Sequence, residues 1–182
     1  MNLERLALMP ARDRSIRLDT HRGRPITNVV APAITERERR LYTSIRARYG
    51  SRWQPRKDAC GVYNCFGHVF ASRRAAIYQV EEIDGKVRPD DGYRVISWEH
   101  ARVGDVAVYR DRRDRKDIHH VGLIVSVAYE PDRHRLPQIW VLSKWNDVTG
   151  EDVHLINDVQ HLSKAFELQI EVWSDCADEG LS

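Results

Sequence analysis

Cysteine is the residue type in this chain best suited to covalent chemistry, and Cys65 stands where its thiolate would be favoured. Asn64, directly before it, is a strong helix N-cap, so the sequence predicts that a helix begins at Cys65. The free N–H groups and the dipole at a helix start favour an anion such as a thiolate. The same amides, with Asn64 nearby, can stabilise an oxyanion on a substrate carbonyl, and Gly67 would let that substrate approach closely. The alternative is a small buried cysteine at the start of a core helix.

A thiolate nucleophile also needs a base, and His120 is the candidate. It stands next to His119, where a charged loop meets an alternating apolar stretch over residues 121–127 that predicts a β-strand. A histidine at the start of a strand can face the N-terminus of a neighbouring helix. Gly122 falls on the same strand face as His120 and would leave that face open. Taken alone, the position would suit a surface histidine at the end of a strand.

Three short motifs follow one another in the order Asn64–Gly67, Gly104–Tyr109 and His120–Ile124. The separations are 39 residues from Cys65 to Gly104 and 16 residues from Gly104 to His120. Over about residues 60–145 this set resembles the NlpC/P60 superfamily of papain-like cysteine hydrolases. The resemblance implies that Cys65 is the nucleophile and His120 the general base.

The resemblance also implies a third polar residue, on the next strand, that orients the imidazole of His120. That position falls closest to Ser143, whose hydroxyl can accept a hydrogen bond from the ring. Asn146 and Asp147, just past the strand end, and His154, on the following strand, are alternatives. Ser143 would otherwise be a strand hydroxyl bonded to backbone or water. Lys144 beside it is predicted to be a solvated cation.

The sequence departs from the family pattern at two positions around the cysteine. Asn64 stands where an acidic residue often precedes the nucleophile, and bulky Phe66 replaces the usual serine after it. The pair of Asn64 and Cys65 with His68 close behind is also similar to the permuted, lipid-acting branch of the superfamily. In that branch the catalytic histidine precedes the cysteine. Here Cys65 precedes His120, so the unpermuted branch fits better.

The surrounding pattern predicts the elements that position these residues. Thr35 and Glu38 form a capping box that starts a helix over residues 35–49, and a second helix is predicted from Cys65 to Val80. The turn-rich stretch 84–92 is predicted to be a loop. Beyond it, four or five short strands are indicated by apolar alternation around residues 106–108, 121–127, 139–143, 153–155 and 166–172.

Helices first and strands later predict an α+β fold with an antiparallel sheet. The resemblance implies the papain-like, NlpC/P60-type version of this class, in which the cysteine-bearing helix packs on that sheet.

The chain has 182 residues, which suits one domain with a small appendage. We expect a basic N-terminal extension with one helix over residues 1–50, a catalytic domain over 51–175 and an acidic, frayed tail over 176–182. Residues 1–60 hold 14 basic and 6 acidic residues, a net charge of +8 in a chain whose net charge is +2. We expect this Arg-rich arm either to dock on the chain itself or to bind nucleic acid or a protein partner.

Several classes of protein are disfavoured by composition and motif. No apolar run approaches the roughly 18 residues of a membrane helix, and the first residues contain no apolar block of signal-peptide length. We therefore expect a cytoplasmic protein without a membrane partner, whose export would need a route other than Sec. The spacing of Cys60, Cys65 and His68 is not a common zinc pattern, and nucleotide-binding glycine motifs do not occur. No metal or cofactor is expected.

These features predict a thiol-dependent hydrolase of the peptidase or amidase type, acting on an amide or related acyl substrate through an acyl-Cys65 intermediate. Many members of the superfamily cut peptidoglycan peptides, so such a peptide is one candidate substrate. The alternative is a non-catalytic papain-fold module that uses the Arg-rich arm to bind nucleic acid or a protein. The two interpretations differ in whether Cys65 is reactive.

Overall fold

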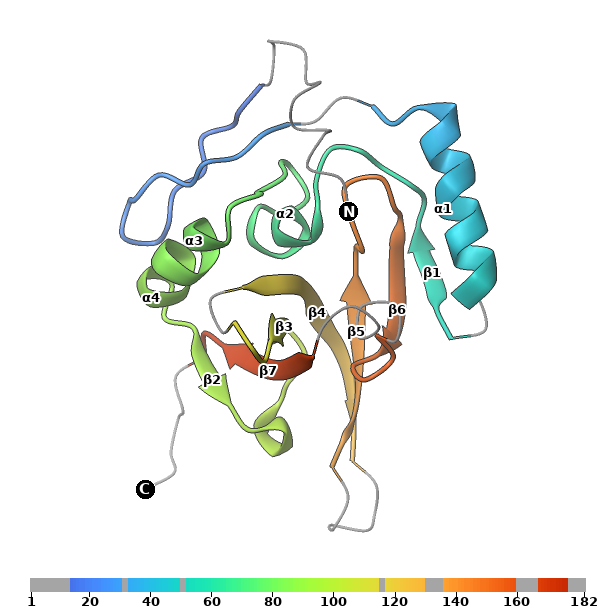
Figure 1. Cartoon of the computed structure of the whole chain (residues 1–182). Helices are drawn as coiled ribbons and strands as arrows, with labels where there is room; N and C mark the ends of the chain where they lie inside the picture. The colour runs from blue at the N-terminus through green and yellow to red at the C-terminus, as the bar shows by residue number, and fades with distance from the viewer. Residues whose placement is uncertain are drawn as a thin grey trace, which may run out of the picture.

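The computed structural model describes residues 14–30, 33–49, 52–114, 117–129, 136–159 and 167–176. Within these residues seven strands form one antiparallel sheet in the order β1-β6-β5-β4-β3-β7-β2 (Figure 1). The strands are β1 (Gln54–Lys57), β2 (Arg94–Ile96), β3 (Val106–Asp111), β4 (Ile118–Ala128), β5 (Gln138–Ser143), β6 (Glu151–Leu155) and β7 (Leu168–Ser174). The predicted α+β class with an antiparallel sheet is confirmed.

The longest described helix, α1 (Glu36–Tyr49), begins at the predicted capping box. The N–H of Thr35 donates to the Glu38 carboxylate at 2.7 Å, and the N–H of Glu38 donates to Thr35 Oγ1 at 3.3 Å. In Figure 1, α1 lies outside β1 at one edge of the sheet. The remaining helices are α2 (Cys65–Phe70), α3 (Val80–Glu82), the π-helix η2 (Ile83–Val87), α4 (Arg88–Asp90) and the 3-10 helix η3 (Trp98–His100).

The helix predicted from Cys65 to Val80 begins where expected but is wrong in length, because α2 ends at Phe70. Two residues soon after it, Ser72 and Arg73, adopt the left-handed conformation with φ of 48° and 65°. This conformation costs a non-glycine residue roughly 1–2 kcal/mol and stops a right-handed helix. The chain turns back at this point instead of continuing along the helix axis.

The loop predicted over residues 84–92 is also wrong, because α3, η2 and α4 form one continuous helical segment over residues 80–90. Ile83 and Val87, four residues apart, are both buried. Lys86 also pairs with Glu82 across one helical turn, at 2.8 Å. Burial of an apolar helix face thus overrides the turn signals of Gly85 and its neighbours.

Two strands, β1 and β2, were not expected from the sequence. All four residues of β1 are exposed, so the strand carries no apolar alternation. It forms by pairing with β6, as β2 forms by pairing with β7. Short exposed strands at the sheet edges are defined by these partners, which lie far away along the chain.

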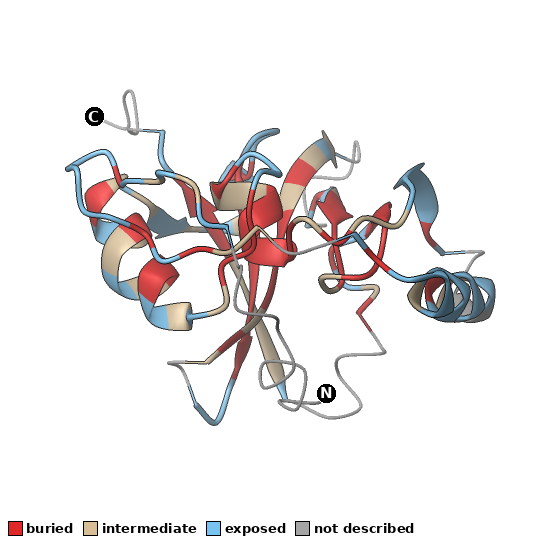
Figure 2. Ribbon diagram, turned by 90° about the horizontal axis from the view of Figure 1, so that it is seen from above, coloured by how far each residue is buried: buried red, intermediate tan, exposed pale blue. Residues whose placement is uncertain are grey.

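Apolar side chains cover both faces of the sheet in two clusters. On one face, Cys65 and Phe66 of α2 belong to a cluster that also contains Val108 and Val121 of the sheet. Tyr109, the neighbour of Val108, belongs to the cluster on the other face, as the alternation of strand residues requires. The first four residues of α2 are buried, whereas α1 is mostly exposed (Figure 2). Helix α2 therefore packs on the face of the sheet that carries Val108 and Val121, whereas most of α1 faces solvent.

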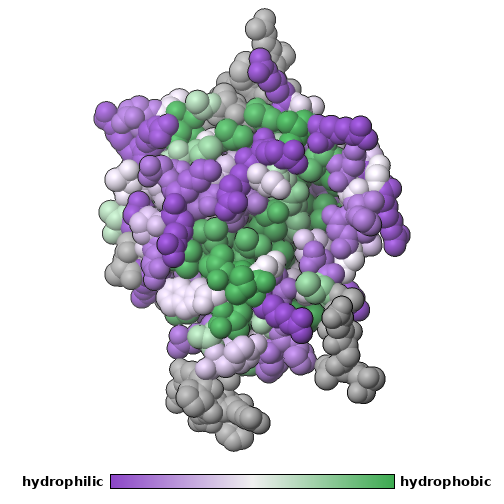
Figure 3. Space-filling view, turned by 180° about the vertical axis from the view of Figure 1, so that it is seen from behind, coloured by the Kyte–Doolittle hydropathy of each residue, from purple (hydrophilic) through white to green (hydrophobic). Residues whose placement is uncertain are grey.

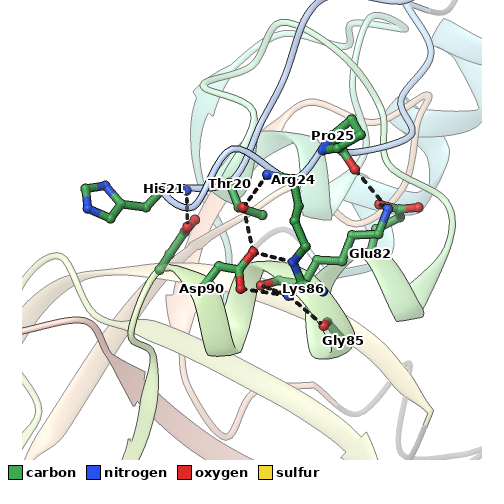
Figure 4. A network of polar contacts seen from close by, with 9 residues as sticks. Thr20, His21, Arg24, Pro25, Glu82, Gly85, Lys86 and Asp90 are labelled. Carbon is green, nitrogen blue, oxygen red and sulfur yellow. Dashed lines mark hydrogen bonds and ion pairs between the residues drawn. The ribbon is translucent and has the colours of Figure 1, made fainter.

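The described part of the basic leader, residues 14–30, packs against the helical segment over residues 80–90 (Figure 4). The guanidinium of Arg24 donates to both carboxylate oxygens of Asp90, at 2.6 and 2.7 Å, and the Thr20 hydroxyl donates to the same carboxylate at 2.6 Å. Lys86 donates to the carbonyl oxygen of Pro25 at 2.8 Å. Within the described residues, Arg24 of the leader is thus paired with a carboxylate of the chain itself.

The predicted domain boundary at residue 50 stays a prediction, and residues 177–182 of the predicted tail lie outside the described residues. Helix α1 is bonded to the sheet, since the Tyr42 hydroxyl donates to Asp152 of β6 at 3.0 Å.

Seen from the rear, apolar side chains gather in the middle of that face and hydrophilic ones surround them (Figure 3). None of the described helices has both the length and the apolar composition needed to cross a membrane.

Candidate active site

The predicted N-cap of the cysteine helix is formed by the side chain of Asn64. Its Oδ1 accepts from the N–H of Gly67 at 2.9 Å and from the N–H of Ile77 at 3.1 Å. Its Nδ2 donates to the carbonyl oxygen of Ile77 at 2.5 Å. These bonds fix the start of α2 and fasten it to the segment that returns after the turn. The predicted contribution of Asn64 to an oxyanion site stays a prediction.

Cys65 is the first residue of α2, and its side chain is buried, with only 8 % of the residue exposed. Burial raises the pKa of the Cys65 thiol to about 11. The backbone N–H groups of Val121, Phe66 and Cys65 itself act in the opposite direction and lower the pKa of the thiol. The sequence-based expectation of a favoured thiolate is therefore wrong for this structure, because burial outweighs the helix start.

The sequence predicted that Gly67 would let a substrate approach closely, and this prediction is wrong because the space beside Gly67 is filled. A Cβ atom at this position would overlap the backbone carbonyl of Ala75. The glycine is therefore required because the returning chain packs directly on its α-carbon. The Gly67 amide still has a role at the site, since it binds Asn64.

His120 lies in β4, where it is paired with Tyr109 of β3, and only 1 % of it is exposed. Its ring stacks on Trp145 with a centroid separation of 4.8 Å and lies 5.5 Å from the ring of Tyr109. The next residue along the strand, Val121, belongs to the same core cluster as Cys65. The fold thus brings the predicted nucleophile to the strand that carries the predicted base, while the His120 ring lies with Tyr109 on the strand face opposite Val121.

Gly122, expected to leave the face of His120 open, is instead covered. A Cβ atom there would lie 2.5 Å from Ser143 Oγ and would overlap a methyl group of Val141. Ser143 is paired with Gly122 across β4 and β5, so its side chain falls on the same face as that of His120. Gly122 therefore lets the Ser143 hydroxyl lie close against the strand that carries His120.

Ser143 and His154, two of the four candidates for the orienting residue, lie within hydrogen-bond distance of each other. Ser143 Oγ lies 2.8 Å from Nε2 of His154, while Nδ1 of the same ring lies 2.8 Å from the carbonyl oxygen of Leu155. A carbonyl oxygen can only accept, so in the neutral ring Nδ1 carries the proton and Nε2 accepts from the Ser143 hydroxyl. Trp145 lies against His154 as well, with centroids 4.5 Å apart. The structure thus groups His120, Ser143, Trp145 and His154.

Asn146, another of the candidates, lies in the turn between β5 and β6, as does the last candidate, Asp147. Its Oδ1 accepts from the N–H of Val148 at 2.9 Å, and its backbone N–H and carbonyl bond the hydroxyl of Thr149. These contacts place Asn146 in a local turn motif. A role for it at the site stays a prediction.

Lys144, predicted to be solvated, is fully buried, and that expectation is wrong. Its ammonium donates to the carbonyl oxygens of Cys60 and Thr149 at 2.6 and 2.5 Å, and it lies 4.8 Å from the ring centroid of Tyr63. Burial lowers the pKa of Lys144 to about 8, and its charge opposes the rise in the pKa of the Cys65 thiol. One sequence signal indicated this burial. Residues alternate between the two faces of a strand, so Lys144 falls on the face opposite Ser143.

A second polar cluster missed by the sequence analysis lies one helical turn beyond Cys65. The carboxylate of Glu151 accepts from Tyr63 Oη at 2.5 Å and from Arg73 Nε at 2.7 Å, and lies 3.7 Å from Nε2 of His68. Burial lowers the pKa of His68 to about 4, and neither of its ring nitrogens has a hydrogen-bond partner among the described residues. Tyr63, His68 and Arg73 are near one another in the sequence, but Glu151 follows Arg73 by 78 residues, so no local pattern indicates the cluster.

Within the described residues, no three His, Cys, Asp or Glu side chains gather in a way that could hold a metal ion. No protein-family model, curated protein or solved structure matches the chain.

Proposed function

We propose that the protein is a thiol-dependent hydrolase of the peptidase or amidase type, with Cys65 as nucleophile and His120 as general base. The observation that carries this proposal is the position of Cys65 as the first residue of α2, capped by Asn64 and packed in one cluster with Val121, the residue after His120. The backbone N–H groups of Cys65, Phe66 and Val121 lower the pKa of this thiol. Donors arranged in this way stabilise negative charge on the sulfur and on an oxygen bound beside it. The papain-like, NlpC/P60-type architecture is part of the same proposal.

The proposed reaction starts from a neutral thiol, because burial keeps Cys65 protonated. His120 takes the thiol proton as the sulfur attacks the substrate carbonyl carbon, and the Cys65 amide donates to the resulting oxyanion. The carbon–nitrogen bond then breaks, and the amine leaves with the proton from His120. Water, deprotonated by His120, hydrolyses the acyl-Cys65 thioester, and the proton returns to the sulfur as the free acid departs.

Ser143 is proposed to orient the base, supported by its bond to His154. In the neutral ring of His154, Nε2 accepts a hydrogen bond from the Ser143 hydroxyl. The lone pairs of the Ser143 oxygen therefore remain available to an N–H donor. An imidazole N–H of His120 is such a donor, and both side chains lie on the same face of the sheet. A serine fixed in this way can hold the imidazole in one tautomer.

The proposal is tested by trapping the acyl intermediate. Protein in which Cys60 and Cys176 are replaced by Ser is mixed with a panel of thioester and activated amide substrates, and acylation of Cys65 is followed by mass spectrometry. Acylation that is lost in Cys65→Ala, reduced in His120→Ala and retained in His100→Ala is the expected result, since His100 is exposed. Turnover that persists in Cys65→Ala would overturn the assignment.

A second function is favoured by one observation, the burial that raises the pKa of the Cys65 thiol. An unreactive thiol would suit a non-catalytic module that binds nucleic acid or a protein through its basic leader. Deletion of residues 1–33, which hold six arginines and three acidic residues, removes the basic leader and so separates the two functions. The binding module predicts salt-sensitive polyanion binding that this deletion abolishes, whereas the hydrolase predicts acylation of Cys65 that survives it.

A further inference from the structure

A cavity of about 580 Å³ lies on the face of the sheet that α2 covers, beyond the end of that helix. Leu142 and Val153 line it, and both are linked by strand pairing to Leu123. Leu123 is two residues from Val121, which belongs to the same core cluster as Cys65. Because alternate residues share a strand face, the cavity and the thiol lie on the same side of the sheet.

Part of the lining of the cavity is apolar. It consists of Val125, Trp140, Leu142 and Val153 from β4, β5 and β6, and Gln54 and Ser126 add uncharged polar groups. Trp140 is partly exposed, whereas Leu142 and Val153 are buried. A volume of this size and such a lining are typical of sites that bind small molecules or a few residues of a peptide.

One side of the cavity is charged, with two guanidinium groups and one carboxylate, from Arg56, Arg73 and Glu151. Arg73 binds Glu151 through Nε–Oε1 at 2.7 Å and Nη2–Oε2 at 3.1 Å, so the charge of Glu151 is already balanced. Burial raises the pKa of Glu151, but hydrogen bonds from Arg73 and Tyr63 lower it by more, so the carboxylate is ionised at neutral pH. The lining therefore carries one positive charge in excess, which matches a single anionic group on a ligand.

We propose that this cavity binds an apolar peptide segment that ends in a carboxylate, with the carboxylate facing Arg56 and Arg73. A planar guanidinium group such as that of Arg56 binds a carboxylate through paired hydrogen bonds, whereas Arg73 keeps its paired bond to Glu151 and adds positive charge beside the ligand. The apolar part of the lining accommodates aliphatic side chains. The identification of this segment as part of a substrate rests on the hydrolase proposed above. Binding of the peptide in the cavity does not depend on that proposed hydrolase activity.

The distance from the thiol sets the length of such a substrate. Val121, beside Cys65, and Val125, in the cavity, are four residues apart in β4, or about 13 Å at the rise of an extended strand. An extended peptide running beside the strand would have roughly four residues between the cleaved bond and the part of the cavity lined by Val125. The site would thus favour peptides with a free carboxyl terminus over internal peptide bonds.

Binding is tested by calorimetric titration of the full chain carrying Cys65→Ala with acetyl-Leu-Leu, its carboxamide acetyl-Leu-Leu-NH2, and octanoate. We expect the peptide acid to bind about tenfold more tightly than the amide, because only the acid carries the charge that pairs with the guanidinium groups. Arg56→Gln should weaken binding of the acid by a similar factor and leave the amide unchanged. Arg74→Gln is the matched control, since Arg74 adjoins Arg73 but does not line the cavity.

Arg73→Gln is a second variant, read together with its thermal unfolding because it leaves Glu151 without its bidentate partner. Equal affinity for acid and amide, no binding of either, or equal losses in Arg56→Gln and Arg74→Gln would each overturn the proposal. Binding of octanoate without binding of the peptide acid would overturn the peptide assignment. Because the titration uses an inactive variant, its outcome is independent of whether Cys65 is a nucleophile.

Discussion

The α-carbon of Gly67 lies so close to the carbonyl oxygen of Ala75 that no side chain fits between them. Gly67→Ala should therefore displace the returning chain from α2 and destabilise the protein by roughly 2 kcal/mol or more, as overpacking of a rigid contact does. Gly85→Ala is the control, since no atom lies within 4 Å of its added Cβ. The control should be neutral or stabilising by about 0.5–1 kcal/mol, because alanine favours a helix. Urea unfolding of both variants checks the difference, and equal stabilities would contradict the contact.

The thiol of Cys65 should react slowly at neutral pH. With a pKa of about 11, only roughly one thiol in a thousand is ionised at pH 8. In a protein with Cys60→Ser and Cys176→Ser, the rate of alkylation by iodoacetamide should therefore climb about tenfold per pH unit up to about pH 10. A plateau that begins below pH 8 would show that the thiolate is more stable than its burial implies.

The hydroxyl of Ser143 should matter for turnover and not for substrate binding. Ser143→Ala removes the group proposed to hold His120, so kcat should fall by about tenfold to a hundredfold with little change in KM. His154→Gln should give a smaller loss of the same kind, because it acts through Ser143. Steady-state kinetics on the first substrate found checks both, with Ser97→Ala, an exposed serine, as control. A change confined to KM would contradict an orienting role.

The carboxylate of Asp90 should hold residues 14–30 on the helical segment. Hydrogen bonds from Arg24 and Thr20 lower the pKa of Asp90 to about 2. A lowered pKa means that this stabilisation is present above the ordinary value near 3.8 and is lost as the pH falls through about 2. Asp90→Asn should therefore speed hydrogen exchange over residues 14–30 at neutral pH, whereas Asp58→Asn at an exposed position should not. Unchanged exchange in Asp90→Asn would mean that other contacts hold this segment.

The buried ring of His68 should make the protein acid-sensitive. Burial lowers the pKa of His68 from 6.5 to about 4, so between these values the unfolded chain binds more protons than the folded one. Stability is then present above pH 6.5 and is lost as the pH falls toward 4, by up to about 3 kcal/mol. His68→Gln, which does not titrate, should flatten this dependence in urea unfolding at pH 7 and pH 4.5. A slope that is identical in both proteins would assign the acid sensitivity to other groups.

Local features of the sequence predicted local features of the structure. The capping box of Thr35 and Glu38, the helix start at Cys65 and the alternating strands around residues 106–108 and 121–127 all occur as expected. Each depends on hydrogen bonds or on side-chain alternation within a few residues. The two edge strands and the helix over residues 80–90 were missed, because pairing with distant strands and burial against the sheet decide them.

The sequence by itself determined that a cysteine would begin a capped helix and that a histidine would lie in a strand of an antiparallel sheet. Only the tertiary structure decided the surroundings of these residues. It buries Cys65 enough to reverse the expected shift of its pKa, buries Lys144 between two carbonyl oxygens, and joins Ser143 to His154. The reason is physical, since burial and electrostatic environment are sums over neighbours that lie dozens of residues away along the chain, whereas capping and alternation are set by adjacent residues.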